Sequence, residues 1–262
     1  MNTLAYTLTD SATMLRRNLR HVVRYPVTLF VAAVPIIFLL LFVVVFGETM
    51  GAGLGGVTGG RGEYASYVTP GILLMTVAGG AQGTAISVAM DMTEGIIARF
   101  RTMAIARSSV LTGHVVGNMI QTMLAVAAVV GVALLVGFRP SASPLEWLSA
   151  TGLLALITFA VTWLSVALAL TAKTVEAASN LPMPLMLLPF LGSGFVPTES
   201  MPAAMRWFAE YQPFTPVMET LRGLLLGTPI GHNGLLAIAW GVGITAVGYL
   251  WAKRRYDRGP AR

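Results

Sequence analysis

The sequence predicts an all-α integral membrane protein, a single transmembrane domain over residues 1–262. Apolar residues make up 55% of the chain and charged residues only 11%, a composition far from that of a soluble domain. Long segments without charge follow one another, each close to the ~20 residues that a helix needs to cross a ~30 Å hydrocarbon core. Basic residues flank these segments as topology signals do, so the net charge of +6 does not indicate nucleic acid as a partner.

Residues 11–25 are expected to form an amphipathic helix in the membrane interface. Two leucines and two valines share one side of its helical wheel. Arg16, Arg20 and Arg24, spaced by four, share an adjacent side, with Arg17 nearby. Arginines in that arrangement face the anionic lipid headgroups. The alternative is a plain topology anchor whose helicity carries little meaning.

Six apolar segments are expected to cross the membrane as helices. The first is interrupted only by Pro35, whereas the fifth contains Pro182, Pro184 and Pro189. Glycine-rich or polar connections separate the segments. The predicted spans are residues 27–46, 67–90, 115–138, 147–172, 177–196 and 234–252.

The distribution of basic residues predicts the orientation of the six spans. An even number of crossings places both termini on one side, together with residues 91–114 and Lys173. That side holds thirteen Lys and Arg residues, against four on the other. By the positive-inside rule, both termini lie in the cytoplasm of a multi-pass plasma-membrane protein, and residues 197–232 lie outside.

Residues 197–232 are expected to form a re-entrant helical hairpin between the fifth and sixth spans. Two short amphipathic segments, separated at Pro213 and Pro216, are each too short to cross a bilayer. Such a hairpin is tolerated at membrane depth only where protein or a cavity surrounds it. Glu219 and Arg222 lie three residues apart on its second helix, which suits a buried pair or an ordinary surface salt bridge.

The sequence lacks the residues that several kinds of function would need. The chain has no cysteine and no Gly-x-x-x-x-Gly-Lys-Ser/Thr motif, so thiolate chemistry and a nucleotide-binding P-loop are absent. No metal site is expected, because His21, His114 and His232 are scattered at segment edges. No charged residue lies in the middle of a span, which disfavours the proton relay of a secondary transporter. An intramembrane hydrolase also lacks a histidine at membrane depth to activate Ser87 or Ser165.

Residues 91–114 form a polar segment between the second and third spans. Glu94 lies near the expected helix start, where the helix dipole favours an acid. An apolar stripe follows, and Arg99, Arg101 and Thr102 point away from it. The segment is therefore either an interfacial helix at the cytoplasmic membrane edge or a docking helix whose charged face meets a soluble partner.

Two stretches resemble the permease subunit of type-2 ABC exporters, particularly the daunorubicin-resistance (DrrB-like) branch. One is Asp-Met-Thr-Glu-Gly-Ile-Ile-Ala-Arg-Phe-Arg-Thr-Met-Ala-Ile-Ala-Arg-Ser at 91–108, which departs from that branch's loop at Ala104, where proline is expected. The other is Gly-Phe-Val-Pro at 194–197, followed by Gln-Pro-Phe-Thr-Pro at 212–216 and then Glu219 and Arg222. The resemblance covers essentially the whole chain.

The resemblance implies a permease subunit that exports hydrophobic or amphipathic compounds, such as antibiotics, other drugs or lipid-linked molecules. It is not itself an enzyme, because ATP and Mg²⁺ would bind two copies of a separate ABC ATPase. A second permease copy, in a homodimer, and membrane lipids would be its other partners. The outer hairpin would cap the exit. The residues that would couple to the ATPase are Glu94, Gly95, Arg99, Phe100, Arg101, Thr102 and Arg107.

Two other classes of function remain alternatives. A secondary transporter or channel would work without an ATPase. An intramembrane enzyme would be active without ATP and would need a nucleophile and a base at one depth.

Overall fold

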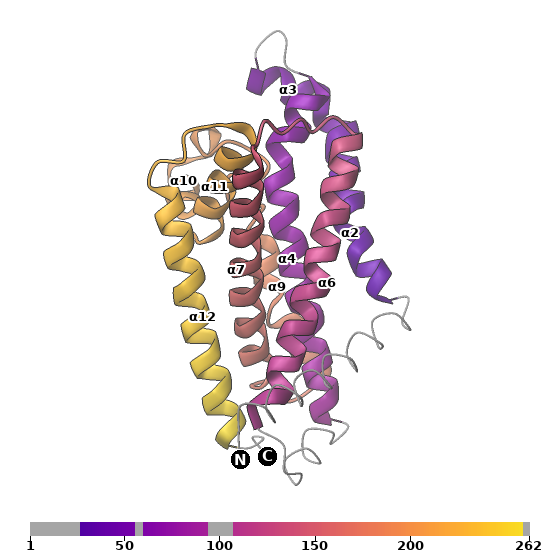
Figure 1. The fold of residues 1–262 in the computed structure, drawn as a ribbon, viewed down its shortest axis with the longest axis vertical. Coiled ribbons are helices and arrows are strands. Elements are labelled where there is room, and N and C mark those ends of the chain that lie inside the picture. The colour runs from indigo at the N-terminus through magenta and orange to yellow at the C-terminus, as the bar shows by residue number, and fades with distance from the viewer. Residues whose placement is uncertain (1–26, 56–59, 94–106, 259–262) are drawn as a thin grey trace.

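The structure is a computed structural model that describes residues 27–55, 60–93 and 107–258. Every regular element in these ranges is helical (Figure 1). The elements are α2 (Val27–Leu41), η1 (Phe42–Phe46, a π-helix), α3 (Gly47–Gly55), α4 (Arg61–Thr93), α6 (Arg107–Leu135), α7 (Pro144–Ala169), α8 (Val175–Asn180), α9 (Met183–Leu187), η3 (Thr198–Ser200), α10 (Ala203–Tyr211), α11 (Phe214–Leu226) and α12 (Asn233–Arg258).

Five helical stretches in the described part of the chain are long and apolar enough to cross a membrane. They correspond to the first, second, third, fourth and sixth predicted spans, so the prediction of an all-helical integral membrane protein is confirmed. Their bounds are Ala33–Ala52, Arg61–Thr93, Leu111–Leu135, Pro144–Ala169 and Asn233–Tyr256.

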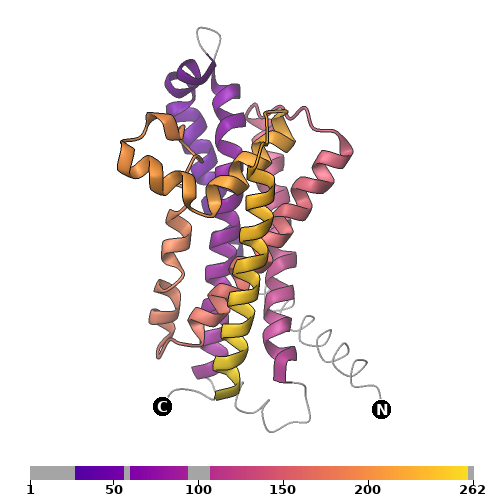
Figure 2. The same ribbon diagram turned by 90° about the vertical axis from the view of Figure 1, so that its left-hand side faces the viewer.

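The fifth predicted span is not one helix. Residues 177–196 consist of most of α8, all of α9 and a run of turns, so a count of six transmembrane helices is not confirmed. The three prolines of this segment favour the breaks, because a proline beyond the first turn of a helix clashes with the preceding turn and removes a backbone N–H. Pro184 lies in the first turn of α9, where a helix accepts it. Single prolines do not break α2 or α4, which contain Pro35 and Pro70. In Figure 2 the segment lies beside α4, below the hairpin of α10 and α11.

Two contacts fix the direction of this broken segment. Gln82 Nε2 on α4 donates to the Ser179 carbonyl over 2.8 Å. Further along, the backbones of Gly71 and Gly194 meet so closely that a Cβ on Gly71 would lie 2.9 Å from Gly194 Cα. Eleven residues of helix separate the two contacts on α4, about 16 Å. The segment therefore climbs antiparallel to α4 over roughly half the thickness of a hydrocarbon core.

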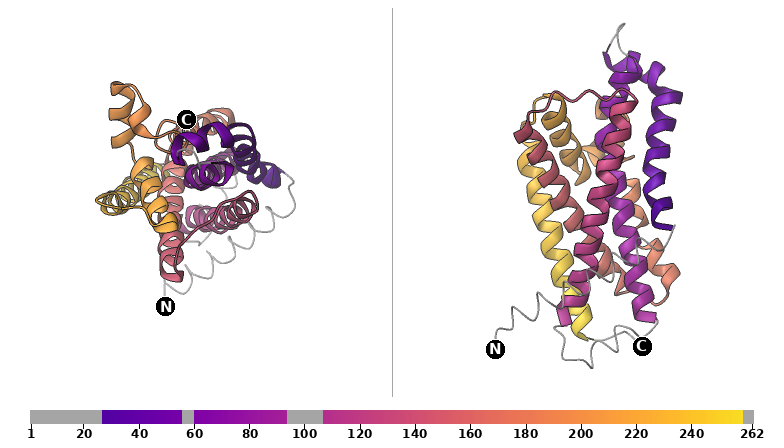
Figure 3. Two further views of the ribbon diagram at one scale, coloured as in Figure 1. Left: turned by 90° about the horizontal axis from the view of Figure 1, so that it is seen from above. Right: turned by 45° about the vertical axis from the view of Figure 1, so that its right-hand side comes forward.

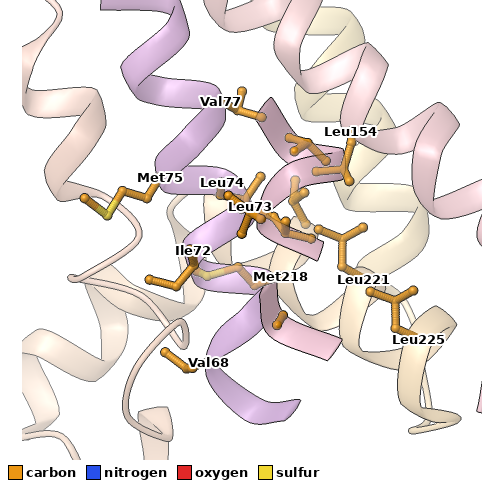
Figure 4. Packing of buried hydrophobic residues seen from close by; sticks show 14 of the residues in the cluster. Val68, Ile72, Leu73, Leu74, Met75, Val77, Leu154, Met218, Leu221 and Leu225 are labelled. Carbon is orange, nitrogen blue, oxygen red and sulfur yellow. The ribbon is translucent and has the colours of Figure 1, made fainter. Parts of the chain in front are cut away.

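Helix α4 is the centre of the bundle, and Figure 3 shows α2, α6 and α7 around it, with α12 further out against α7. Its middle is almost wholly buried, with Ile72, Leu74 and Val77 all at 0% exposure. Figure 4 shows this core, in which α4 meets Leu154 of α7 and Leu221 of α11. A second, smaller apolar cluster lies near the Thr93 end of α4 and unites α4, α6, α7 and α12.

A small polar layer joins three helices within the bundle. Asn118 of α6 donates from Nδ2 to Thr162 Oγ1 of α7 over 2.8 Å, and Thr122 Oγ1 donates to Asn118 Oδ1 over 3.3 Å. Gly80 of α4 faces this layer, and a Cβ there would collide with Thr122 Oγ1. Small residues and interhelical hydrogen bonds are what hold membrane helices close together, because lipid supplies no hydrophobic drive between them.

Local sequence signals explain where α7 and α11 begin and end. Ser143 caps α7 in a reciprocal capping box with Glu146, and Pro144 occupies the first helical position. Gly227 ends α11 with φ of 75°, a left-handed conformation that glycine adopts without a Cβ penalty.

Candidate functional site

The two ends of the bundle differ in the elements and the exposed basic residues that lie there. The last residues of α4, α7 and α12 and the first residues of α6 lie together at one end, called here the Thr93 end (Figure 1). The α6–α7 connection, α10 and α11 lie at the opposite end, called the hairpin end. Exposed bases at the Thr93 end are Lys173, Lys253, Arg254 and Arg255, and those at the hairpin end are Arg61, Arg139 and Arg206.

Most residues of the predicted coupling segment lie outside the described ranges. These are Glu94, Gly95, Arg99, Phe100, Arg101 and Thr102, and the predicted interfacial helix with Arg16, Arg17, Arg20 and Arg24 also lies outside them. Arg107 is the first residue of α6. The described helices that flank residues 94–106 therefore end at Thr93 and begin at Arg107, both at the same end of the bundle (Figure 1).

Helix α11 is inserted into the bundle and is not a surface loop. Val217, Met218, Leu221 and Leu225 are each at most 1% exposed, and Figure 4 shows three of them packed towards α4. The helix contacts α4, α7 and α12. Every face of α11 that carries apolar residues thus meets protein.

The two prolines expected to separate the hairpin helices lie at positions that a helix tolerates. Pro213 is the N-cap of α11, and Pro216 lies in its first turn. The backbone N–H groups of a first turn have no partner inside the helix, so a proline there removes no hydrogen bond. The prolines therefore separate α10 from α11 without interrupting α11.

Arg222 ties α11 to two other segments. Its Nη1 lies 2.5 Å from Glu219 Oε1 within α11. Its Nη2 donates to the carbonyl of Tyr67 on α4 over 3.1 Å and to that of Ser193 on the broken segment over 2.9 Å. The guanidinium carbon also lies 4.0 Å from the centroid of the Tyr67 ring, a cation–π distance.

Burial decides between the two interpretations of this pair. Arg222 is 6% exposed, whereas the Glu219 side chain is 30% exposed, so the guanidinium is buried and the carboxylate is half-buried, which excludes an ordinary surface salt bridge. Its Nε has no hydrogen-bond partner, and neither has the buried hydroxyl of Ser193 nearby. A buried guanidinium is costly unless an acid and carbonyls surround it, and Glu219, Tyr67 and Ser193 supply both.

Tight backbone contacts support the same region. Gln212, at the junction of α10 and α11, donates from Nε2 to the Leu188 carbonyl over 3.0 Å and to Thr215 Oγ1 over 3.1 Å. Gly192 lies against it, because a Cβ on Gly192 would collide with Gln212 Nε2. Gly194 thus lets the broken segment approach the backbone of α4 at Gly71. Gly192 leaves room for the side chains of Gln212, Thr215 and Met218.

Helix α10 presents aromatic side chains outward. Trp207 and Tyr211 are each 66% exposed, and their rings lie 5.5 Å apart. Arg206 turns back instead and donates to the carbonyls of Thr198, Glu199 and Met201. Exposed Trp and Tyr are typical of the membrane–water interface.

The sequence did not reveal one buried contact between two polar side chains. His114 Nε2 of α6 lies 3.0 Å from Asp91 Oδ2 of α4, and both residues are 8% exposed. In the sequence the two residues are the first and the last of the polar segment 91–114. Only the hydrogen-bonding capacity of the two side chains could have suggested the contact, and many other pairs of residues share it. Within the described residues no group of three or more metal-ligating side chains comes together.

Comparison with known proteins gives the family. The family model described as ABC-2 type transporter matches residues 10–226, which is most of the chain. The match includes α11 and the Asp91–His114 contact but not α12. The chain belongs to the ABC-2 type transporter family. As an ABC-2 transporter chain it is a transmembrane permease subunit, which confirms the resemblance found in the sequence and the expectation that it is not an enzyme.

Two curated relatives of this ABC-2 permease are similar over most of their length. The daunorubicin resistance ABC transporter permease protein DrrB1 of Streptomyces coeruleorubidus is 29% identical over 226 residues, 85% of this chain and 77% of the relative. The probable doxorubicin resistance ABC transporter permease protein DrrC of Mycobacterium tuberculosis is 28% identical over 218 residues, 81% of this chain and 76% of the relative.

Proposed function

We propose that this ABC-2 permease forms the membrane path of an ATP-driven exporter of hydrophobic or amphipathic compounds. The observation that carries the proposal is the family match over residues 10–226. Relatives named for resistance to daunorubicin and doxorubicin support antibiotics and similar drugs as cargo, with lipid-linked molecules as a related class. A bundle without charged residues at the middle of its spans suits apolar cargo.

The Thr93 end lies in the cytoplasm of a plasma-membrane protein under this proposal, and both termini lie there too. The thirteen Lys and Arg residues on this side of the predicted topology, against four on the other, support this orientation by the positive-inside rule, and Lys173, Lys253, Arg254 and Arg255 are the exposed ones among the described residues. The hairpin end then faces outward, with Trp207 and Tyr211 at the outer interface.

The cytoplasmic partner is an ABC ATPase in two copies, which bind ATP and Mg²⁺. It docks on the segment between Thr93 and Arg107, with Arg107 at its edge. The charged face for docking consists of Glu94, Arg99 and Arg101, flanked by Gly95, Phe100 and Thr102. The N-terminal interfacial helix, with its arginines towards lipid headgroups, supports the same surface.

A second copy of this permease completes the path, in a homodimer. The broken segment 177–196 makes the sixth crossing, and α10 and α11 form a re-entrant hairpin that caps the outer exit. Burial of α11 among α4, α7 and α12 supports that arrangement, because a hairpin at membrane depth needs protein around its backbone groups. The contacts of Arg222 hold the hairpin against α4.

Inside-out vesicles test the proposal directly. The tagged chain is co-expressed with the ATPase that co-purifies with it from native membranes, and daunorubicin serves as a fluorescent probe. We expect Mg²⁺- and ATP-dependent uptake that stops with a non-hydrolysable ATP analogue and persists with a protonophore. Vesicles with the chain alone provide the control.

Two results would overturn the proposal. Uptake that needs no ATP and collapses with the protonophore would indicate a secondary transporter. Purification without any ATPase, combined with chemical turnover of the probe, would indicate an intramembrane enzyme.

A further inference from the structure

The buried pair of Asp91 and His114 joins the two helices that flank residues 94–106. Asp91 lies two residues before the end of α4, and His114 is the eighth residue of α6. Their contact of 3.0 Å is therefore close to both points at which the chain leaves the bundle and returns to it.

The pair lies against an apolar cluster, where a charge is costly. Val88 of α4 and Val115 of α6 are at 0% exposure and Leu111 at 2%, and α7 adds Trp163 and Val166 to the same cluster. Apolar packing alone would hold these helices without a buried polar contact. A buried pair adds direction, because its hydrogen-bonding geometry is satisfied in one relative position of the helices and lost when one of them slides or turns.

Helix α4 continues from this pair to the outer hairpin. Twenty-four residues separate Asp91 from Tyr67, which is about 36 Å of helix. Tyr67 carries the carbonyl and the ring that hold Arg222 of α11. One helix thus has a buried polar contact to α6 near its Thr93 end and another to α11 near its hairpin end.

We propose that Asp91 and His114 are positioning residues for coupling. They lock the end of α4 to the beginning of α6, so that a push on residues 94–106 moves both helices as one body. Without the lock α4 and α6 move independently, and ATP hydrolysis continues while less cargo moves. This inference rests on the proposed function of residues 94–106 as the ATPase docking segment.

The test measures daunorubicin transported per ATP hydrolysed in proteoliposomes that hold the chain and its co-purified ATPase. Asp91→Asn and His114→Gln each lower the ratio, by about tenfold if the lock carries a typical allosteric coupling free energy. The exchange Asp91→His with His114→Asp rebuilds the pair and restores most of the ratio. Glu48→Gln is the matched control, because the Arg61–Glu48 pair is exposed and lies at the other end of the bundle.

A role in packing alone predicts a different pattern. It lowers the amount of folded protein and its thermal stability but leaves transport per ATP in the folded fraction unchanged. That pattern, or an exchange variant that folds and stays uncoupled, would overturn the inference. If the single variants do not fold, the comparison is made between the exchange variant and the double variant Asp91→Asn with His114→Gln. We expect the exchange variant to recover most of the wild-type ratio and the double variant not to.

Failure of the inference is distinguishable from failure of the proposed function. A wild-type chain without ATP-dependent daunorubicin uptake would contradict the proposed function. A wild-type chain that couples normally and loses coupling on Glu94→Ala, while Asp91 and His114 variants keep it, would contradict only the inference.

Discussion

The guanidinium of Arg222 lies 4.0 Å from the centroid of the Tyr67 ring, and its Nη2 donates to the carbonyl of the same residue. One side chain of α11 thus contacts both the backbone and the ring of one residue on α4. The contact bridges 155 positions of sequence. It makes the hairpin end of the bundle sensitive to any change in the spacing of these two helices.

Removing Arg222 should weaken this end of the protein. Arg222→Ala leaves Glu219 without its counter-ion and two carbonyls without a donor, and we expect it to destabilise the fold by about 3 kcal/mol. Thermal unfolding in detergent measures the change, and export in vesicles falls with it. Arg222→Lys keeps the charge but not the planar fork, so its effect should be intermediate. Wild-type stability of Arg222→Ala would contradict the importance of these contacts.

Substitutions in residues 94–106 should separate ATP hydrolysis from export. Glu94→Ala or Arg101→Glu alters the charged face expected to meet the ATPase, so we expect hydrolysis to continue while export falls at normal expression. Arg61→Glu changes a charge at the opposite end and is the control. Unchanged export in both variants would remove residues 94–106 from the coupling role.

A single methyl group should disturb the contact between α4 and the broken segment. In Gly71→Ala the new Cβ would lie 2.9 Å from Gly194 Cα and from the Gly194 carbonyl oxygen, and backbone gives way less easily than a side chain. We expect a loss of about 1–3 kcal/mol by thermal unfolding. Gly83→Ala, on the same helix with nothing within 4 Å, is the matched control and should gain up to ~1 kcal/mol from helix propensity. Equal stability of the two variants would mean that the segments move apart freely.

The absence of cysteine makes the topology directly measurable. Single cysteines replace exposed Lys173 and exposed Glu199, which flank residues 177–196. If this segment crosses the membrane, an impermeant maleimide labels position 199 in intact cells and position 173 only after permeabilisation. Arg61→Cys should label from outside and Arg254→Cys from inside. Labelling of positions 173 and 199 from the same side would rule out the sixth crossing.

Hydropathy located the spans but not their helix limits. The second span was expected at 67–90, whereas α4 extends from Arg61 to Thr93, and α6 begins at Arg107 instead of 115. Hydropathy reports only the portion that suits hydrocarbon, while a helix continues beyond it as long as its backbone hydrogen bonds are satisfied. The broken segment 177–196 shows the opposite difference: its apolar composition suits a span, but it is not one helix, and its three closely spaced prolines disfavour one.

Composition and hydropathy were enough to establish the membrane class and five spans, and the stretches at 91–108 and 194–222 carried the family resemblance. The sequence also located the prolines that shape α11 and the three-residue spacing of Glu219 and Arg222. Tertiary structure alone decided that Arg222 is buried against Tyr67, that Gly71 meets Gly194, and that Asp91 meets His114. Each of these contacts joins segments far apart in the chain. Their partners are chosen by how the helices pack, and no local periodicity records that choice.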